Sequence, residues 1–106
     1  EIKAAGTPPF MSPEQQAGAN LGFYTDIFAL GVTLFNVVTG QLPFTGSATD
    51  VLRKNRSSER PHVTQVTPYA NPGFQPIIEK AMSPNPALRY QTCEEMMMDL
   101  QKLCNL

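Results

Sequence analysis

The sequence predicts an all-α fold, and two features of the chain point to it. Apolar residues recur at helical spacing in several stretches, and no two stretches alternate apolar and polar residues as paired β-strands do. Ten prolines divide the 106 residues into blocks of helix length separated by loops. A chain of this size suits one small domain, so we expect a single helical unit.

Residues 1–24 are predicted to form an extended loop, because they show no sustained periodicity. Pro8, Pro9 and Pro13 disfavour a helix through this stretch, since proline lacks a backbone N–H and restricts the residue before it. A short turn around residues 14–17 is the one local structure we expect here.

Residues 26–39 are predicted to form the longest helix. Thr25 is a suitable N-cap, Asp26 is favourable in the first turn, and Gly40 is a suitable stop. One apolar stripe runs along it: Ile27, Leu30, Leu34 and Val38. Other faces carry further apolar residues: Phe28, Val32 and Phe35. A helix that is apolar nearly all round is expected to be buried.

Gly31 lies in the middle of this predicted helix. Glycine in a helix interior costs ~1 kcal/mol relative to alanine. We therefore expect another part of the molecule to approach the backbone closely at Gly31.

A short helix and a loop are predicted next. Ser47 with Asp50 resembles a capping box, which opens a short helix through Val51 and Leu52 towards Asn55. The basic residues Arg53, Lys54 and Arg56 fall near the negative end of that helix. Residues 57–73 are predicted to be loop.

Two more helices are expected after this loop. The first is marked by four apolar residues at helical spacing: Phe74, Ile77, Ile78 and Ala81. Pro76 is tolerable in its first turn, and residues 83–86 end it. Thr92 with Glu95 forms a capping box that opens the last helix. Its inner face is formed by Met96, Leu100 and Leu103. The run of methionines at residues 96–98 is interpreted as adaptable core packing rather than a binding surface.

Charge and hydropathy exclude several function classes. The net charge is -1 and the isoelectric point about 5.7, so no basic field points to nucleic acid or anionic lipid. The four cations of residues 53–60 are interrupted by Ser57, Ser58 and Glu59, and we interpret them as a solvated loop. The longest apolar stretch, residues 27–38, is shorter than the ~20 residues of a membrane span. We expect a cytoplasmic location.

Cysteine and histidine usage predicts neither a disulfide nor a metal site. On one helix, Cys93 and Cys104 would lie roughly 16 Å apart, too far for a bridge. His62 stands alone, without the convergent partners that zinc needs. The chain starts with Glu1 and lacks a signal peptide, so we expect it to be a piece of a longer protein.

Four stretches, in order along the chain, resemble protein kinase motifs. Residues 6–14 (GTPPFMSPE) resemble the end of the activation segment, with Phe10 in place of the usual tyrosine and Ser12 in place of alanine. Residues 26–32 resemble the start of the central helix of the large lobe, and residues 39–44 the turn after it. Residues 86–90 resemble the loop that holds a late arginine. The chain thus resembles the C-terminal part of the large lobe of eukaryotic-like Ser/Thr kinases, with a bacterial-type variant favoured.

The resemblance implies roles for several residues. Glu14 and Arg89 are expected to form a buried ion pair that pins the activation-segment end to the helical subdomain; the alternative is two unrelated surface charges. Asp26, with Gly31, is expected to anchor the catalytic loop; the alternative for Asp26 is a plain first-turn carboxylate. The region near Val51 resembles a docking surface for substrates and regulators, and a generic surface helix is an equal alternative.

A substrate pocket is also implied at the activation-segment end. Thr7 resembles the threonine that hydrogen-bonds near the catalytic base of Ser/Thr kinases. The expected pocket residues are Gly6, Thr7, Pro8, Pro9 and Phe10. They would hold the substrate residue that follows the phospho-acceptor.

The resemblance divides the chain into residues 1–18, the end of the activation segment, and residues 19–106, the helical subdomain. The small lobe and catalytic loop do not occur within residues 1–106, so we predict no catalytic residue and no nucleotide or metal site here. ATP and magnesium would be bound by the parent kinase. The chain itself is expected to be inert and to contribute substrate-binding and scaffold surface.

Two other functions remain as alternatives. One is a pseudokinase or a regulatory helical interaction module without catalysis; the less favoured one is a helical domain of unrelated origin. The expected partners are a protein substrate and either the missing kinase portion or a second copy, bound through exposed apolar surface. No nucleic-acid or membrane partner is expected for this segment.

Overall fold

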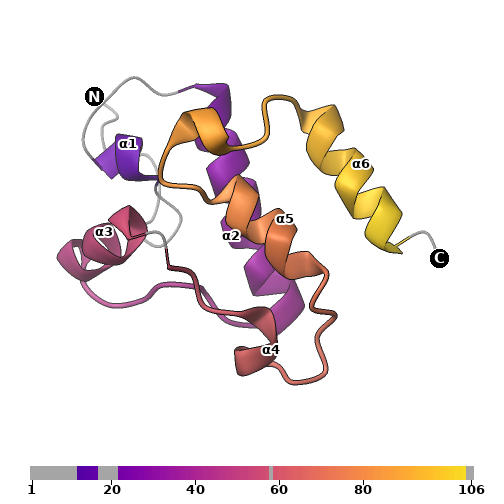
Figure 1. The fold of residues 1–106 in the computed structure, drawn as a ribbon. Coiled ribbons are helices and arrows are strands. Elements are labelled where there is room, and N and C mark those ends of the chain that lie inside the picture. Colours follow the sequence, from indigo (N-terminus) through magenta and orange to yellow (C-terminus); the bar gives the residue numbers. More distant parts are fainter. Residues whose placement is uncertain (1–11, 17–21, 58, 105–106) are drawn as a thin grey trace.

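The computed structural model describes residues 12–16, 22–57 and 59–104 (Figure 1). Within these ranges the chain is helical and contains no strand, so the predicted all-α fold is confirmed. The elements in order are α1 Pro13–Gln16, α2 Phe23–Thr39, α3 Ala48–Arg56, α4 Val63–Val66, α5 Phe74–Ala81, the 3-10 turn η2 Pro86–Leu88 and α6 Cys93–Cys104.

The long helix α2 lies at the centre of the molecule. Helix α5 packs along it, α6 packs on α5 at one edge, and α1 and α3 contact each other on the opposite side (Figure 1). The described part measures 45 × 28 × 21 Å along its principal axes.

Helix α2 begins earlier than the sequence predicts. Its N-cap is Gly22, so the prediction that Thr25 caps the helix is wrong. Thr25 lies in the first turn, where its backbone N–H donates to the Gly22 carbonyl at 3.0 Å. At the other end, Gly40 adopts φ +77° and donates its N–H to the Asn36 carbonyl, as expected of a glycine stop.

Only one side of α2 is buried, which corrects the prediction of a helix buried all round. Its buried residues include Phe28, Gly31, Val32 and Phe35, which recur at helical spacing. Leu30, placed by sequence in the main apolar stripe, is 46% exposed, and Val37 is 74% exposed. Helix α5 packs against the side of α2 that carries Gly31. The described residues leave the Val37 side chain largely uncovered.

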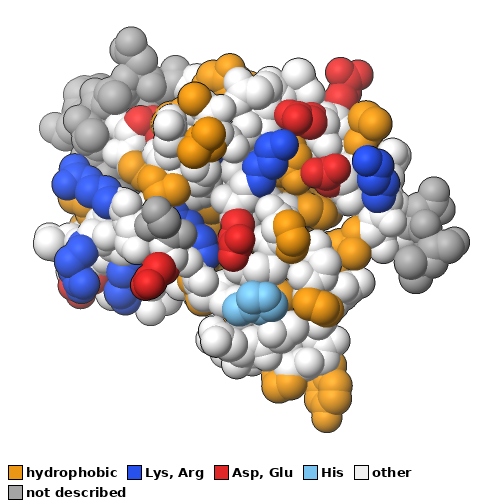
Figure 2. Space-filling model, viewed as in Figure 1, with side chains coloured by type: hydrophobic (Ala, Val, Ile, Leu, Met, Phe, Trp, Pro, Cys, Tyr) orange, Lys and Arg blue, Asp and Glu red, His pale blue; other side chains and the backbone are white. Residues whose placement is uncertain are grey.

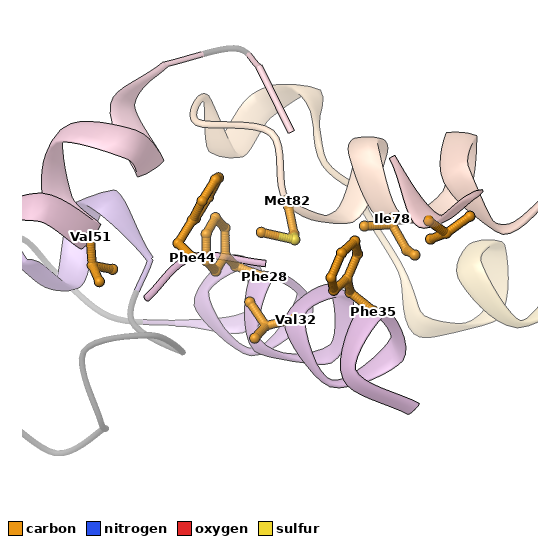
Figure 3. Packing of buried hydrophobic residues seen from close by; sticks show 8 residues of the cluster. Phe28, Val32, Phe35, Phe44, Val51, Ile78 and Met82 are labelled. Carbon is orange, nitrogen blue, oxygen red and sulfur yellow. The ribbon is translucent and has the colours of Figure 1, made fainter. Parts of the chain in front are cut away.

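Two apolar clusters form the core. The larger joins α2 to α5 and the segments around α3 and α4, as Figure 3 shows: Phe28, Val32, Phe35, Phe44, Val51, Val63, Ile78 and Met82. The smaller joins α2, α5 and α6: Ile27, Ile77, Ala81, Tyr90 and Met96. Both clusters use α2 and α5, so this helix pair is the scaffold on which the other elements pack.

The helix signals around α3 and α5 are confirmed. The Ser47 Oγ accepts the Asp50 backbone N–H at 3.1 Å, and the three basic residues lie in the last turn of α3. Helix α5 runs from Phe74 to Ala81 with Pro76 in its first turn. The four-residue helix α4 was predicted as loop; His62 caps it through Nδ1, which accepts the Thr64 N–H at 3.2 Å.

Helix α6 contacts α5 through an ion pair between the Lys80 Nζ and the Glu95 Oε2, 3.3 Å apart, beside further polar contacts at the start of α6. The Thr92 Oγ1 accepts the Glu95 N–H at 3.0 Å, so the predicted cap is confirmed. Tyr90 donates its hydroxyl to Asp99 at 2.8 Å, and Lys80 lies 4.6 Å from the Tyr90 ring centre. Burial and the bond to Asp99 raise the pKa of Tyr90.

The methionines and cysteines of α6 have different environments. Met96 is buried, but Met97 and Met98 are 54% and 55% exposed, so core packing explains the first methionine only. Cys93 and Cys104 are free thiols and both are exposed. No helix in the described ranges has the length and apolar character needed to cross a bilayer.

Candidate functional site

Arg89 and Glu14 meet where α1 touches the loop after α5. The turn η2 positions Arg89: the Asn85 Oδ1 accepts the Ala87 N–H at 3.0 Å, and the Arg89 N–H donates to the Pro86 carbonyl at 3.2 Å. The Arg89 side chain is 0% exposed and that of Glu14 is 14% exposed. The structure therefore brings together two side chains that are 75 positions apart in the sequence.

The contact between these side chains is bidentate. The two terminal nitrogens of Arg89 donate to Glu14, one to Oε2 at 2.6 Å and the other to Oε1 at 2.8 Å. Two matched N–H···O bonds between a planar guanidinium and a carboxylate are directional as well as charge-assisted. We call this contact, with its two residues, the Glu14–Arg89 clamp.

Backbone groups and an aromatic ring complete the surroundings of Arg89. Its guanidinium donates to the Tyr24 carbonyl at 2.8 Å and, through Nε, to the Ser83 carbonyl at 2.8 Å. The Phe28 ring centre lies 4.9 Å from the guanidinium carbon, a cation–π distance. One arginine thus joins α1, the start of α2 and the segment after α5.

Thr25 supports the carboxylate side of the clamp. Its Oγ1 donates to the Glu14 Oε2 at 3.0 Å. Burial alone raises the pKa of Glu14, but hydrogen bonds from Arg89, its own backbone and Thr25, with the Arg89 charge, lower it overall below 4.5. Glu14 is therefore ionised at neutral pH. The role of Thr25 was missed because its sequence position also suits a helix cap.

A second arginine, Arg60, lies next to this site and was not singled out by sequence. All three of its guanidinium nitrogens donate to backbone carbonyls, which belong to Met82, Lys54, Asn55, Ser57 and Glu59. Burial, and to a smaller degree the charge of Arg89, lower the pKa of Arg60 to about 10. Arg60 and Arg89 bind the adjacent carbonyls of Met82 and Ser83, so the end of α5 connects the clamp with α3.

The described part of the chain offers no metal site. No group of three or more His, Cys, Asp or Glu side chains in those ranges could hold a metal ion. His62 uses Nδ1 to cap α4.

Most of the chain matches one known protein family. The protein kinase domain family matches residues 2–101 of the chain.

This chain belongs to the protein kinase family.

Similar kinases come from several bacteria. The chain is 39% identical over 99 residues to the serine/threonine-protein kinase pkn3 of Myxococcus xanthus, and 36% over 97 residues to the serine/threonine-protein kinase PrkC of Bacillus subtilis. It is 33% identical over 105 residues to the serine/threonine-protein kinase PknB of Mycobacterium tuberculosis. These matches cover 91%, 91% and 94% of the chain but only 18%, 15% and 16% of the relatives. The expected resemblance to bacterial Ser/Thr kinases agrees with these matches.

The two residues expected to anchor the kinase catalytic loop lie on different sides of α2. The Asp26 side chain is exposed in the first turn, and no described residue hydrogen-bonds to it. Gly31 faces α5, where an added Cβ would meet the Met82 Cγ at 2.8 Å and the Ala81 Cβ at 2.9 Å. The expected close approach at Gly31 is therefore made by α5.

The kinase substrate pocket expected at the activation-segment end lies outside the described residues. This applies to Gly6, Thr7, Pro8, Pro9 and Phe10. Ser12, which follows them and is described, is buried.

Proposed function

We propose that this chain is the activation-segment end and helical subdomain of a Ser/Thr protein kinase. In this proposal residues 1–18 carry the substrate pocket, with Gly6, Thr7, Pro8, Pro9 and Phe10 beside the acceptor, and residues 19–106 form the scaffold. The parent enzyme transfers the γ-phosphoryl group of ATP to a serine or threonine hydroxyl of a protein.

The Glu14–Arg89 clamp is the observation that carries the proposal. An activation segment must be held in one position to line a substrate site, because phosphoryl transfer depends on positioning. A buried bidentate ion pair gives such a hold at a single point. The clamp therefore gives the segment before α2 a fixed attachment to α2 and η2.

The chain alone is proposed to be catalytically inert. Phosphoryl transfer needs groups that cradle the phosphates, bind magnesium and orient the nucleophile. The described residues contain no cluster of three or more His, Cys, Asp or Glu side chains that could hold a metal, and the motifs that bind ATP and magnesium in kinases do not occur in residues 1–106. In the parent enzyme those groups supply the charge neutralisation, and this chain contributes the substrate side.

Asp26 is proposed to connect the two parts. Its carboxylate is exposed, lies at the start of a helix fixed by the clamp, and has no described partner. An exposed carboxylate of this kind is suited to accept backbone N–H groups from the catalytic loop of the parent. Gly31 contributes indirectly, because it allows α5 to hold α2 in place.

The proposed partners are a protein substrate and the remaining kinase portion. Helix α3 is proposed as a docking surface for the substrate. The exposed apolar side of α2, with Leu30 and Val37, is proposed to pack against the remaining portion of the kinase or, in its absence, against a second copy. We propose a cytoplasmic location for the parent.

A phosphate-transfer assay tests the proposal. The open reading frame that contains this chain is expressed whole, and its transfer of radiolabelled phosphate from ATP to a generic protein substrate is compared with that of residues 1–106. We expect turnover from the whole protein and none from residues 1–106. Turnover by residues 1–106 contradicts the proposed inertness, and a whole protein without turnover favours the pseudokinase or regulatory alternative.

A further inference from the structure

Positive charge is concentrated around α3 in a chain that is negative overall. Of the eight Lys and Arg residues, four lie between positions 53 and 60, although the net charge of the chain is -1. Three of them occupy the last turn of α3, and Figure 2 shows blue side chains gathered over that part of the molecule. The prediction of a solvated loop is wrong for this stretch, because Arg53, Lys54 and Arg56 lie on α3 and Arg60 is half-buried among backbone carbonyls.

A groove lies directly beside this charge. It has a volume of about 380 Å³, and its apolar lining comes from Pro43, Phe44 and Pro61. Its charged lining comes from Lys54, Arg60 and Glu59. Two cations against one carboxylate leave the groove positive, and its volume is within the range of about 300–1,000 Å³ common for ligand pockets.

The two cations of the groove act differently. Arg60 is already bound to backbone carbonyls and stacks 5.1 Å from the Phe44 ring centre, so it contributes charge but few hydrogen bonds. The Lys54 Nζ donates to the Thr45 carbonyl at 3.1 Å, and an ammonium group has two further N–H donors. Lys54 is therefore the group that can bind an incoming anion.

We propose that this groove docks an acidic segment of a partner protein, in which an apolar side chain stands beside Asp or Glu. The apolar side chain would pack on Pro43 and Pro61 and on the small exposed part of Phe44, and the neighbouring carboxylate would pair with Lys54. Arg56, exposed on the same turn, would attract the acidic segment at longer range, whereas Arg53 is paired with Asp50 at 3.3 Å. The proposal rests on the proposed docking function of α3 and names the class of partner.

A protein segment suits the groove better than nucleic acid. Phosphate backbones bind extended rows of cations, whereas this groove has an apolar lining and a carboxylate at its wall. The positive charge is also confined to this part of the chain, because acidic residues elsewhere bring the net charge to -1.

Fluorescence anisotropy on the 106-residue chain tests the proposal. The probe is a short labelled peptide of Asp and Glu around a single Phe, compared with the same peptide carrying Asn and Gln. We expect the acidic peptide to bind more tightly, and its affinity to fall as salt is added. Lys54→Glu is expected to weaken binding by about fivefold or more, and Arg56→Glu by less, because Arg56 does not line the groove.

Lys102→Glu is the matched control. It makes the same change of charge at an exposed position in the last turn of α6, far along the chain from the groove. Circular dichroism checks that each variant keeps its helices, and Arg56→Glu provides a second variant if Lys54→Glu unfolds. Equal binding of acidic and amide peptides, equal effects of Lys54→Glu and Lys102→Glu, or binding of a labelled oligonucleotide in place of the peptide would overturn the proposal.

The peptide measurement does not depend on catalysis. If the acidic peptide does not bind but the whole protein still transfers phosphate, the docking proposal is wrong and the proposed kinase function is unaffected. If the whole protein binds the peptide but transfers no phosphate, the result supports the docking proposal and contradicts the proposed kinase activity.

Discussion

At the scale of single residues, Arg89 decides how α1 is attached to the rest of the described chain. A buried guanidinium is unfavourable unless its donors are satisfied, and here one carboxylate and two backbone carbonyls accept them. Burial raises the desolvation cost of forming the ion pair, and it also raises the cost of removing one partner, because the other is left buried with its charge unpaired. The clamp is therefore a point where one substitution has a large effect.

Replacing Glu14 is expected to destabilise the chain strongly. Glu14→Gln leaves the buried Arg89 with its charge but without its counter-ion, and places an amide N–H₂ against a donor. Breaking a buried pair by removing one partner typically costs ~3–5 kcal/mol, and the partial exposure of Glu14 favours the lower end of this range. Urea denaturation measures the loss. The control is Glu94→Gln on the exposed face of α6, expected to change stability by less than about 0.5 kcal/mol.

The clamp also predicts how stability depends on pH. The pKa of Glu14 is lowered in the folded chain, so its contribution is complete above the ordinary pKa of 4.5 and is lost as the pH falls through the folded value. The unfolding free energy of the unchanged chain should fall more steeply below pH 4.5 than that of Glu14→Gln. Parallel pH profiles for the two proteins would show that Glu14 is not responsible.

At the scale of elements, the pair α2 and α5 sets the geometry. Gly31 lets α5 approach until a Cβ at that position would lie 2.9 Å from the Ala81 Cβ. Ala81 is itself rigid on its helix and buried, so it cannot move aside by rotating a side chain. The gain from close packing therefore offsets the cost of a glycine inside α2.

Gly31→Ala tests this contact. Alanine improves helix propensity by ~1 kcal/mol, so propensity alone predicts a more stable chain. We expect the reverse, a loss of about 1–3 kcal/mol, because α2 and α5 must separate or distort. Thermal denaturation distinguishes the two. Gly22→Ala is the control, since no atom lies within 4 Å of an added Cβ there and only a small capping effect is expected.

At the scale of the whole molecule, an apolar surface between α2 and α6 remains open in the described ranges. A cavity of about 420 Å³ lies there, lined by Leu30, Thr33, Leu34, Cys93, Met96, Met97 and Leu100. Open apolar surface of this kind tends to find a partner. In the proposed function that partner is the remaining kinase portion.

The 106-residue chain on its own is expected to self-associate. Light scattering should give a mass above 11.7 kDa that rises with concentration, and a hydrophobic dye should bind. Leu30→Lys places a charge in the open cavity and should reduce both signals, whereas Lys102→Glu should leave them unchanged. A stable monomer that binds no dye would contradict the expectation.

The sequence alone determined the starts of α3 and α6 and the end of α2, because those signals are local. Ser47, Thr92 and Gly40 act on backbone groups within one turn, so their effects could be predicted from neighbouring residues. The resemblance to protein kinases, carried by short motifs, could also be recognised before any coordinates. The short helix α4 was missed because four residues carry no periodicity.

Only the tertiary structure decided which surfaces meet. Composition could not tell that Phe35 is buried and Leu30 exposed, since both are apolar and the choice depends on where α5 packs. The partners of Arg60, and the support that Thr25 gives Glu14, likewise come from segments distant in sequence. Caps act within a helical turn, whereas burial and charge pairing depend on contacts that form only when the whole chain has folded.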